Sequence, residues 1–193
     1  MTSIIKVDEI QSKSGNGVSA DLGKGQVLEV LSSPCDGSSV TVGSGTYAFE
    51  NVTGVQTLTS SFVDITGSTI AYTPPSGTSA VKYEFQFHHS RVDTDVFSSM
   101  KFFIDSDEVV YARLQISGSK VDMRQYFSWT INIGGSANTN TGRLASWTSA
   151  KTLKMQAQEY NSSYDVLLHQ SNHFASSSTN MFMMPHLTIT AIR

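Results

Sequence analysis

The sequence predicts an all-β protein, an antiparallel β-sandwich of jelly-roll-like type, preceded by an extended N-terminal arm. Three observations predict this fold class: apolar and polar residues alternate over several short runs, clusters of turn-forming residues separate these runs, and no segment shows a helical repeat. Side chains alternate across a strand, so a period of two places one row against a core and the other in water. Many such runs at similar spacing are typical of a sandwich or barrel.

The clearest predicted strand is AVKYEFQFHH, residues 80–89, in which Val81, Tyr83, Phe85 and Phe87 alternate with polar residues. The run 121–133 repeats this pattern over a longer stretch. Further strands are predicted at 26–31, 61–73, 99–104, 108–116, 152–160, 164–170 and 183–192. The turn clusters between them lie at 73–79, 105–108, 117–120, 134–142, 161–163 and 176–180.

The first 25 residues differ in character from the rest, and we divide the chain into an arm and tether, 1–25, and a head domain, 26–193. A short apolar run, IIKVDEI, is followed by Ser, Lys, Gly and Asn. Lys6, Asp8 and Glu9 interrupt the apolar residues, so no secretory signal is predicted. An edge strand of the head is one reading of this run, and an adhesive segment on a flexible tether is the other. The apolar residues concerned are Ile4, Ile5, Val7 and Ile10.

The composition excludes several classes of protein. Charged residues make up 15% of the 193-residue chain, against about 25% in a typical protein. The net charge of −3 argues against a nucleic-acid partner, which requires a basic patch. No window approaches the roughly 20 apolar residues that span a bilayer, so no membrane insertion is expected. Cys35 is the single cysteine, so no intrachain disulfide forms.

The motifs of common catalytic and cofactor sites do not fit this chain, and we expect no enzyme and no cofactor. The stretch GNGVSADLGKG, residues 15–25, lacks the spacing of a phosphate-binding loop, and Gly-x-Ser-x-Gly does not occur. The acids of DSDE, residues 105–108, lack the ligand ladder of a calcium loop, and we interpret them as solvated residues of a hairpin turn. A depolymerase, which needs converging carboxylates, is the enzymatic alternative.

The histidines do not predict a metal site. His88 and His89 are adjacent on a predicted strand and therefore point to opposite faces. His169 and His173 have the spacing of helical ligands, but they lie where a strand runs into a turn. Packed or surface imidazoles are the interpretation that we prefer. In a symmetric oligomer one histidine per subunit could still meet its copies on the axis.

Four stretches resemble small virion proteins of tailed bacteriophages, of a type common in phages of marine bacteria and usually labelled tail fibre-like. They are SIIKVDEIQSKSGNG at 3–17, GQVLEVL at 25–31, SFVDITGSTIAYTPPSGTSAVKYEFQF at 61–87 and LTITAIR at 187–193. The resemblance covers most of the chain, although the middle is variable. The residues from Tyr72 to Pro75 stand where the pattern expects a strand end and a turn.

The resemblance implies a trimeric β-sandwich head, similar to tumour-necrosis-factor-like or complement-type globular heads, whose N-terminal segment attaches it to the particle. The apolar arm residues would then add a strand to a capsid or tail protein or to a trimer mate. The implied function is a non-enzymatic protein of the virion surface, a short trimeric fibre or knob. It serves either host adhesion, as in a tail fibre, or capsid decoration.

A carbohydrate-binding adhesion module is the alternative function, and host surface glycans are the partner that it implies. Trp129, Trp147 and Tyr160 are its candidate platforms, although Trp129 lies on an apolar face and core packing is the simpler interpretation. The glycine-rich turn 134–142 is the candidate receptor-contact loop. Its contact residues would be Asn138, Thr139, Asn140 and Thr141, which offer uncharged donors and acceptors to sugar hydroxyls.

Overall fold

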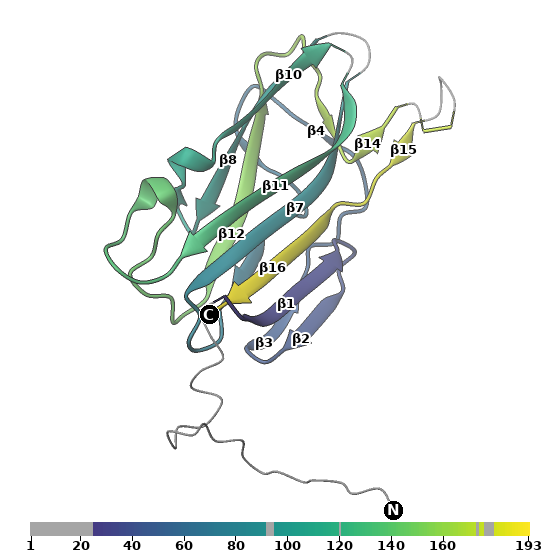
Figure 1. Cartoon of the computed structure of the whole chain (residues 1–193). Coiled ribbons are helices and arrows are strands. Elements are labelled where there is room, and N and C mark those ends of the chain that lie inside the picture. The colour runs from purple at the N-terminus through teal and green to yellow at the C-terminus, as the bar shows by residue number, and fades with distance from the viewer. Residues whose placement is uncertain (1–24, 92–94, 120, 173, 176–179) are drawn as a thin grey trace, which may run out of the picture.

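The computed structural model describes residues 25–91, 95–119, 121–172, 174–175 and 180–193. These residues form two antiparallel β-sheets whose inner faces enclose an apolar core, so the chain folds as a β-sandwich (Figure 1). The predicted fold class is confirmed. The predicted arm, with Ile4, Ile5, Val7 and Ile10, lies outside the described residues apart from Gly25.

Sheet one is centred on β7 (Ala80–Ser90). β11 (Asp122–Asn132) pairs with one edge of β7 along its length, while β16 (His186–Ile192) and β13 (Leu167–Leu168) share the other edge. β1 (Val27–Pro34) extends the sheet beyond β16, and β4 (Gln56–Thr57) extends it beyond β13. Figure 1 shows β11, β7, β16 and β1 side by side.

Sheet two is centred on β8 (Asp95–Ile104). β12 (Lys151–Glu159) pairs with one edge of β8, and β10 (Leu114–Ser119) and β9 (Asp107–Glu108) pair with the other. β5 (Val63–Asp64) and β6 (Ile70–Tyr72) pair with the far side of β12. Two small ribbons complete the strands: β2 (Ser39–Val42) with β3 (Gly45–Ala48), and β14 (Gln170–Ser171) with β15 (Met181–Phe182).

One bent hairpin links the two sheets. Its first arm is β7 followed by β8, and its second arm is β10 followed by β11. Ser90 lies opposite Asp122 in sheet one, and Asp95 lies opposite Ser119 in sheet two. At the bend the Arg91 amide donates to the Val121 carbonyl at 2.6 Å. Because each arm contributes a strand to both sheets, the hairpin fixes how the two outer faces are oriented.

The core follows from the alternation that the sequence shows. In β7 the residues Val81, Tyr83, Phe85 and Phe87 are buried, as predicted. The Tyr83 ring contacts Phe102 of sheet two at 4.8 Å between centroids, so aromatic rings join the two sheets directly. Burial of such rings is the main source of stability in a sandwich core.

The predicted strand over 108–116 is wrong in its middle, where Val110–Ala112 form a 3-10 helix, η2. β9 and β10 both pair with the same edge of β8, Glu108 opposite Phe103 and Leu114 opposite Met100. The chain between them is three residues longer than the matching part of β8. These three residues leave the sheet as a single helical turn, and the Ala112 amide donates to the Val109 carbonyl at 2.9 Å.

The start and the end of the head lie together at one end of the sandwich. The Gly25 amide donates to the Arg193 carbonyl, and the Arg193 amide donates to the Gln26 carbonyl at 2.8 Å. Helical structure in the described part is limited to η2 and η3 (Thr139–Thr141). No helix among the described residues is long and apolar enough to cross a bilayer.

Candidate functional site

The outer face of sheet two carries an unusual combination of rings and amides. The even-numbered residues of β8 from Val96 to Ile104 are buried, so Phe97, Ser99 and Lys101 point away from the core. Strand pairing places Gln115 of β10 and Gln158 of β12 on either side of Ser99. We call this surface the β8 face and define it by Phe97, Lys101, Gln115, Gln158, Tyr160 and Tyr164.

Three aromatic rings form a cluster at the start of β8. Phe97 contacts Tyr160 at 5.1 Å between centroids, and Tyr160 contacts Tyr164 at 6.0 Å with the rings nearly perpendicular. The Tyr160 amide donates to the Phe97 carbonyl at 2.8 Å, which continues the pairing of β12 with β8. Edge-to-face packing therefore holds Tyr160 in place, although its ring is 64% exposed.

The two glutamines next to this cluster have free hydrogen-bonding groups. Within the described part of the chain, neither the Gln115 nor the Gln158 side-chain amide has a protein partner. Each amide offers two donors and one acceptor oxygen. A ligand on the β8 face can therefore replace water at these groups without breaking a bond inside the protein.

The other end of the β8 face is cationic. Lys101 Nζ lies 4.2 Å from the centre of the Phe62 ring and 3.2 Å from a Glu108 carboxylate oxygen. Arg113 Nε lies 2.5 Å from the other oxygen of Glu108. The hydrogen bond from Arg113, together with Lys101, lowers the pKa of the Glu108 carboxyl. One carboxylate thus holds two cations in place at the edge of the face.

Two depressions hollow the surface formed by β8 and β10. One of about 470 Å³ is bordered by residues that include Phe62, Gln115 and Gln158, and the other, of about 290 Å³, by residues that include Phe97 and Tyr164. Both depressions are shallow and adjoin the same strand. The β8 face is therefore an uneven surface that can receive an elongated ligand along β8.

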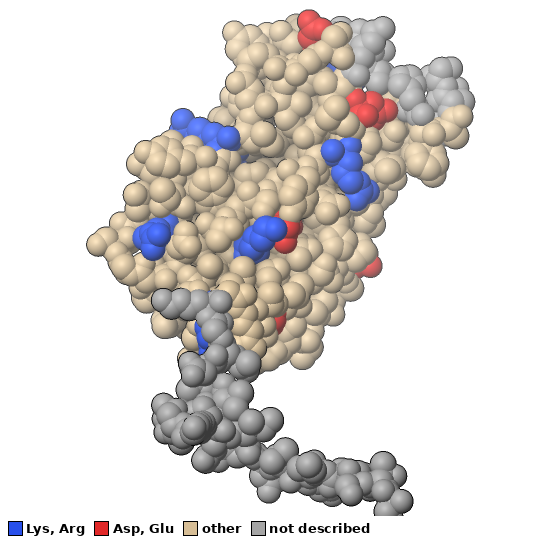
Figure 2. All heavy atoms as spheres, in the orientation of Figure 1, with Lys and Arg blue, Asp and Glu red and all other residues tan. Residues whose placement is uncertain are grey.

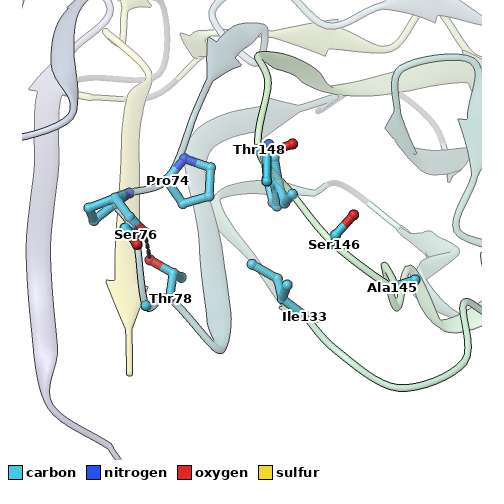
Figure 3. A pocket seen from close by; sticks show the side chains of 10 residues that line it. Pro74, Ser76, Thr78, Ile133, Ala145, Ser146 and Thr148 are labelled. Atoms are coloured by element: carbon cyan, nitrogen blue, oxygen red, sulfur yellow. Dashed lines mark hydrogen bonds between the residues drawn. The ribbon is translucent and has the colours of Figure 1, made fainter.

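A further hollow of about 390 Å³ lies at the opposite end of the sandwich. Figure 3 shows Pro74 and Thr78 of one turn facing Ile133 and the segment 145–148. Two polar groups here are already bonded: Thr78 Oγ1 donates to the Pro75 carbonyl at 2.7 Å, and Trp147 Nε1 donates to the Tyr72 carbonyl at 3.3 Å. Within the described chain, the hydroxyls of Ser146 and Thr148 have no protein partner. This hollow offers a ligand hydroxyls and apolar contact, but its aromatic residue, Trp147, is buried.

The three aromatic side chains that the sequence suggested as sugar platforms differ in their exposure. Trp147 is only 5% exposed and packs edge-on against Tyr72, so the prediction of a platform there is wrong. Trp129 is half-buried against the core, and its Nε1 donates to the Thr141 carbonyl at 3.1 Å. Tyr160 is exposed. Phe97 was missed because its strand was expected to begin only at residue 99. Tyr164 was missed because it was expected to begin a separate strand, 164–170, and its contact with Phe97 is tertiary.

The predicted receptor-contact loop is well folded. Thr139, Asn140 and Thr141 form η3, and Asn138 exchanges backbone hydrogen bonds with Arg143 at 2.9 and 3.0 Å. The side chains of Asn138, Thr139 and Asn140 are exposed. The loop is close to η2 and β9, at the opposite end of β8 from the three-ring cluster. Its role in receptor contact stays a prediction.

The buried histidines gather around one end of sheet one. His88 and His89 point to opposite faces, as predicted: His88 Nε2 lies 2.6 Å from Asp122, and His89 Nε2 lies 2.9 Å from Ser98 Oγ inside the sandwich. Asp122 also accepts hydrogen bonds from Ser171 Oγ at 3.3 Å. Ser171 therefore bonds to the carboxylate and not to the His88 imidazole, which is not the arrangement of a nucleophile with its base. Ser98 does bond to His89, but both side chains are fully buried inside the sandwich, where no substrate reaches them.

Burial changes the titration of two of these histidines. Desolvation lowers the pKa of His89 to about 4, and it lowers the pKa of His169 to about 4 as well. Burial alone would raise the pKa of Asp122, but its hydrogen bonds from His88 and from the Asn172 amide bring it below its usual value. His173 lies outside the described residues. Among the described residues, no three or more His, Cys, Asp or Glu side chains form a metal-binding group.

The remaining reactive groups have structural partners. Cys35 is buried, and desolvation, with Glu50 and Asp36 adding to it, raises the pKa of the thiol to about 12. The acids of the predicted 105–108 turn lie in the β8–β9 hairpin, where Asp105 has φ 56° and pairs with Lys151 at 2.8 Å. These acids are thus partly ion-paired and not only solvated.

Charged residues are sparse on the side of the molecule that carries β11, β7, β16 and β1. Figure 2 shows Lys, Arg, Asp and Glu there as isolated groups among uncharged residues. The polar pairs on this face include Ser32 with Thr188 across β1 and β16 at 2.8 Å, and Lys82 with Glu84 along β7 at 2.7 Å. The low charge content of the sequence is therefore visible as a nearly uncharged outer face.

Comparison with known proteins gives little guidance. No protein-family model matches the chain, and no curated protein matches it. Among solved structures, the chain is similar to one in the structure of infectious bursal disease virus Gt strain, with 8% identity and a TM-score of 0.26. The match spans 81% of this chain and 43% of that one. A likeness at this level carries no argument about fold or function.

Proposed function

We propose that the chain is a non-enzymatic protein of the virion surface, a short trimeric knob attached to the particle by its N-terminal arm, whose head adheres to host glycans through the β8 face. The virion assignment rests on the sequence resemblance of the opening and of the strands at 61–87. The observation that supports glycan adhesion is the three-ring cluster, in which Tyr160 is exposed, beside two amides that have no partner among the described residues.

The chemistry of this face suits a sugar. A sugar ring has an apolar face of C–H groups, which can stack on the electron-rich face of Tyr160, and hydroxyls, which can bond to the Gln115 and Gln158 amides. The rings are already packed against one another, so little side-chain entropy is lost on binding. Uncharged amides are also easier to desolvate than charged groups.

The position of the face suits a knob. The described chain begins at Gly25 beside Arg193, near the residue 80 end of β7. The three-ring cluster lies beyond the other end of β7, where Ser90 leads into β8. An 11-residue strand separates these ends by roughly 35 Å. An arm that anchors the head at Gly25 leaves the cluster pointing away from the particle, and three copies in a trimer add avidity to weak sites.

The test is binding of the purified protein to a panel of neutral and acidic oligosaccharides and to host envelope glycans. We expect Tyr160→Ala to weaken binding on the order of tenfold, because the most exposed ring of the cluster is removed. Tyr111→Ala is the matched control, since Tyr111 is equally exposed at 66% but lies on η2, outside the cluster.

Two results would contradict the proposal. One is unchanged binding by Tyr160→Ala in a protein whose wild type binds. The other is loss of binding in the double variant Asn138→Ala/Asn140→Ala while the separate variant Tyr160→Ala still binds. That result would move the contact to the loop. If the wild type binds no sugar and no host surface, glycan adhesion is rejected and capsid decoration becomes the preferred role.

A further inference from the structure

The larger of the two depressions on the β8 face has an unbalanced charge. Lys101 and Arg113 both border it, whereas none of the described residues that border it carries a carboxylate. Glu108 pairs with both cations from outside this border. In a chain with a net charge of −3, a depression that presents two cations is a local exception.

The geometry leaves both cations able to meet an anion. Glu108 pairs with Nε of Arg113. Because the Arg113 side chain is 57% exposed, its other guanidinium N–H groups face solvent. Lys101 is held by the Phe62 ring at 4.2 Å and by Glu108 at 3.2 Å. An ammonium has three N–H donors, so the ion pair with Glu108 leaves others for an anion. Two positioned cations with free donors form the kind of site that recognises a carboxylate or sulfate.

The cations and the ring cluster lie along one strand. Phe97 and Lys101 are four residues apart on β8 and point to the same face, so roughly 13 Å separates them. Ser99, with Gln115 and Gln158 on either side, lies between them. The order along the face is therefore rings, amides and cations, and a short oligosaccharide can contact all three.

We propose that the β8 face binds an acidic oligosaccharide, with one sugar stacked on the three-ring cluster and a carboxylate or sulfate of another sugar held by Lys101 and Arg113. This inference rests on the proposed function and names its ligand class. The rings supply contact with any sugar, and the cations supply the preference for an acidic one.

The experiment compares three oligosaccharides of equal length: neutral galactose, galacturonic acid and sulfated galactose. Wild-type protein binds one or both acidic probes about tenfold more tightly than the neutral one, and this preference shrinks as salt is raised. Lys101→Gln/Arg113→Gln removes the preference but keeps the binding of the neutral probe. Lys151→Gln/Arg143→Gln changes the net charge equally at sites away from the face, and it retains the preference.

The outcomes separate the two proposals. If the wild type binds neutral and acidic probes equally and Tyr160→Ala abolishes both, the glycan face stands and the acidic inference is wrong. The inference is also wrong if Lys101→Gln/Arg113→Gln keeps the preference, or if the control variant loses it to the same extent. A preference for only one acidic probe identifies the anion. No binding by the wild type overturns both proposals.

Discussion

The outer faces of the two sheets differ in what their polar side chains bind. On sheet one, Lys82 pairs with Glu84 at 2.7 Å, Tyr126 donates to the same carboxylate, and Arg124 Nη1 lies 3.3 Å from the Gln86 amide oxygen. On sheet two, Lys154 and Gln156 of β12 bond to Asp64. On the β8 face of the same sheet, the amides of Gln115 and Gln158 have no partner in the described chain, and aromatic rings lie beside them.

This difference shows how two faces built from the same alternating pattern can take different roles. A polar group that already has a protein partner gains little from a ligand, because the existing bond must be broken first. An unpaired surface amide only exchanges water for ligand. The outer face of sheet one, whose polar side chains bond to one another, is therefore suited to stability. The β8 face is suited to recognition.

The largest effect is expected from the core that both faces share. Phe102→Ala removes a fully buried ring that contacts Tyr83 and Phe127, and we expect it to lower the free energy of unfolding by about 3–5 kcal/mol. Phe103→Ala, one residue further on the half-exposed side of β8, is the control and costs much less. Denaturant titration measures both. Equal losses would mean that the ring contacts between the sheets are not what holds them together.

The next largest effect is a loss of stability in acid, which comes from the buried histidines His89 and His169. The folded-state pKa of His89 and of His169 is about 4, below the ordinary value of 6.5. Between these values the unfolded chain binds more protons, so stability is complete above pH 6.5 and is lost as the pH falls towards 4. Each group contributes on the order of 3 kcal/mol to this loss. Denaturant titration from pH 7 to pH 4 measures it.

A variant assigns the acid effect to its source. His169 has φ 64°, in the left-handed region that asparagine tolerates, so His169→Asn removes the titrating ring with little backbone strain. We expect a flatter dependence of stability on pH in this variant. A curve as steep as that of the wild type would exclude His169 as a source of the loss.

The smallest expected effects are those of single substitutions on the two outer faces, and they test the comparison between these faces directly. Gln158→Ala should weaken oligosaccharide binding severalfold with a change in stability within about 0.5 kcal/mol, because its amide bonds to no other group in the described parts of the chain. Thr188→Val, which breaks the hydrogen bond to Ser32 on sheet one, should leave oligosaccharide binding unchanged and lower stability by about 1 kcal/mol. The opposite pattern would assign recognition to sheet one.

Local pattern in the sequence determined the strands and the direction of their side chains. The alternation of β7 and β12 is read directly from residues 80–89 and 152–160, because apolar side chains on one face of a strand must be buried together. The opposite directions of His88 and His89 follow from the same rule. The turn at 105–108 follows from its composition, since polar residues with flexible backbones favour reversals.

Only the tertiary structure decided which residues meet. The pairing of β8 with β10 and β12 brings Gln115, Ser99 and Gln158 into one row, although 16 residues or more separate each of them from the next along the chain. Packing across the sandwich buries Trp147 and leaves Tyr160 exposed beside Phe97. Strand register and sheet packing depend on contacts between distant segments, and the pattern within any one segment does not contain them.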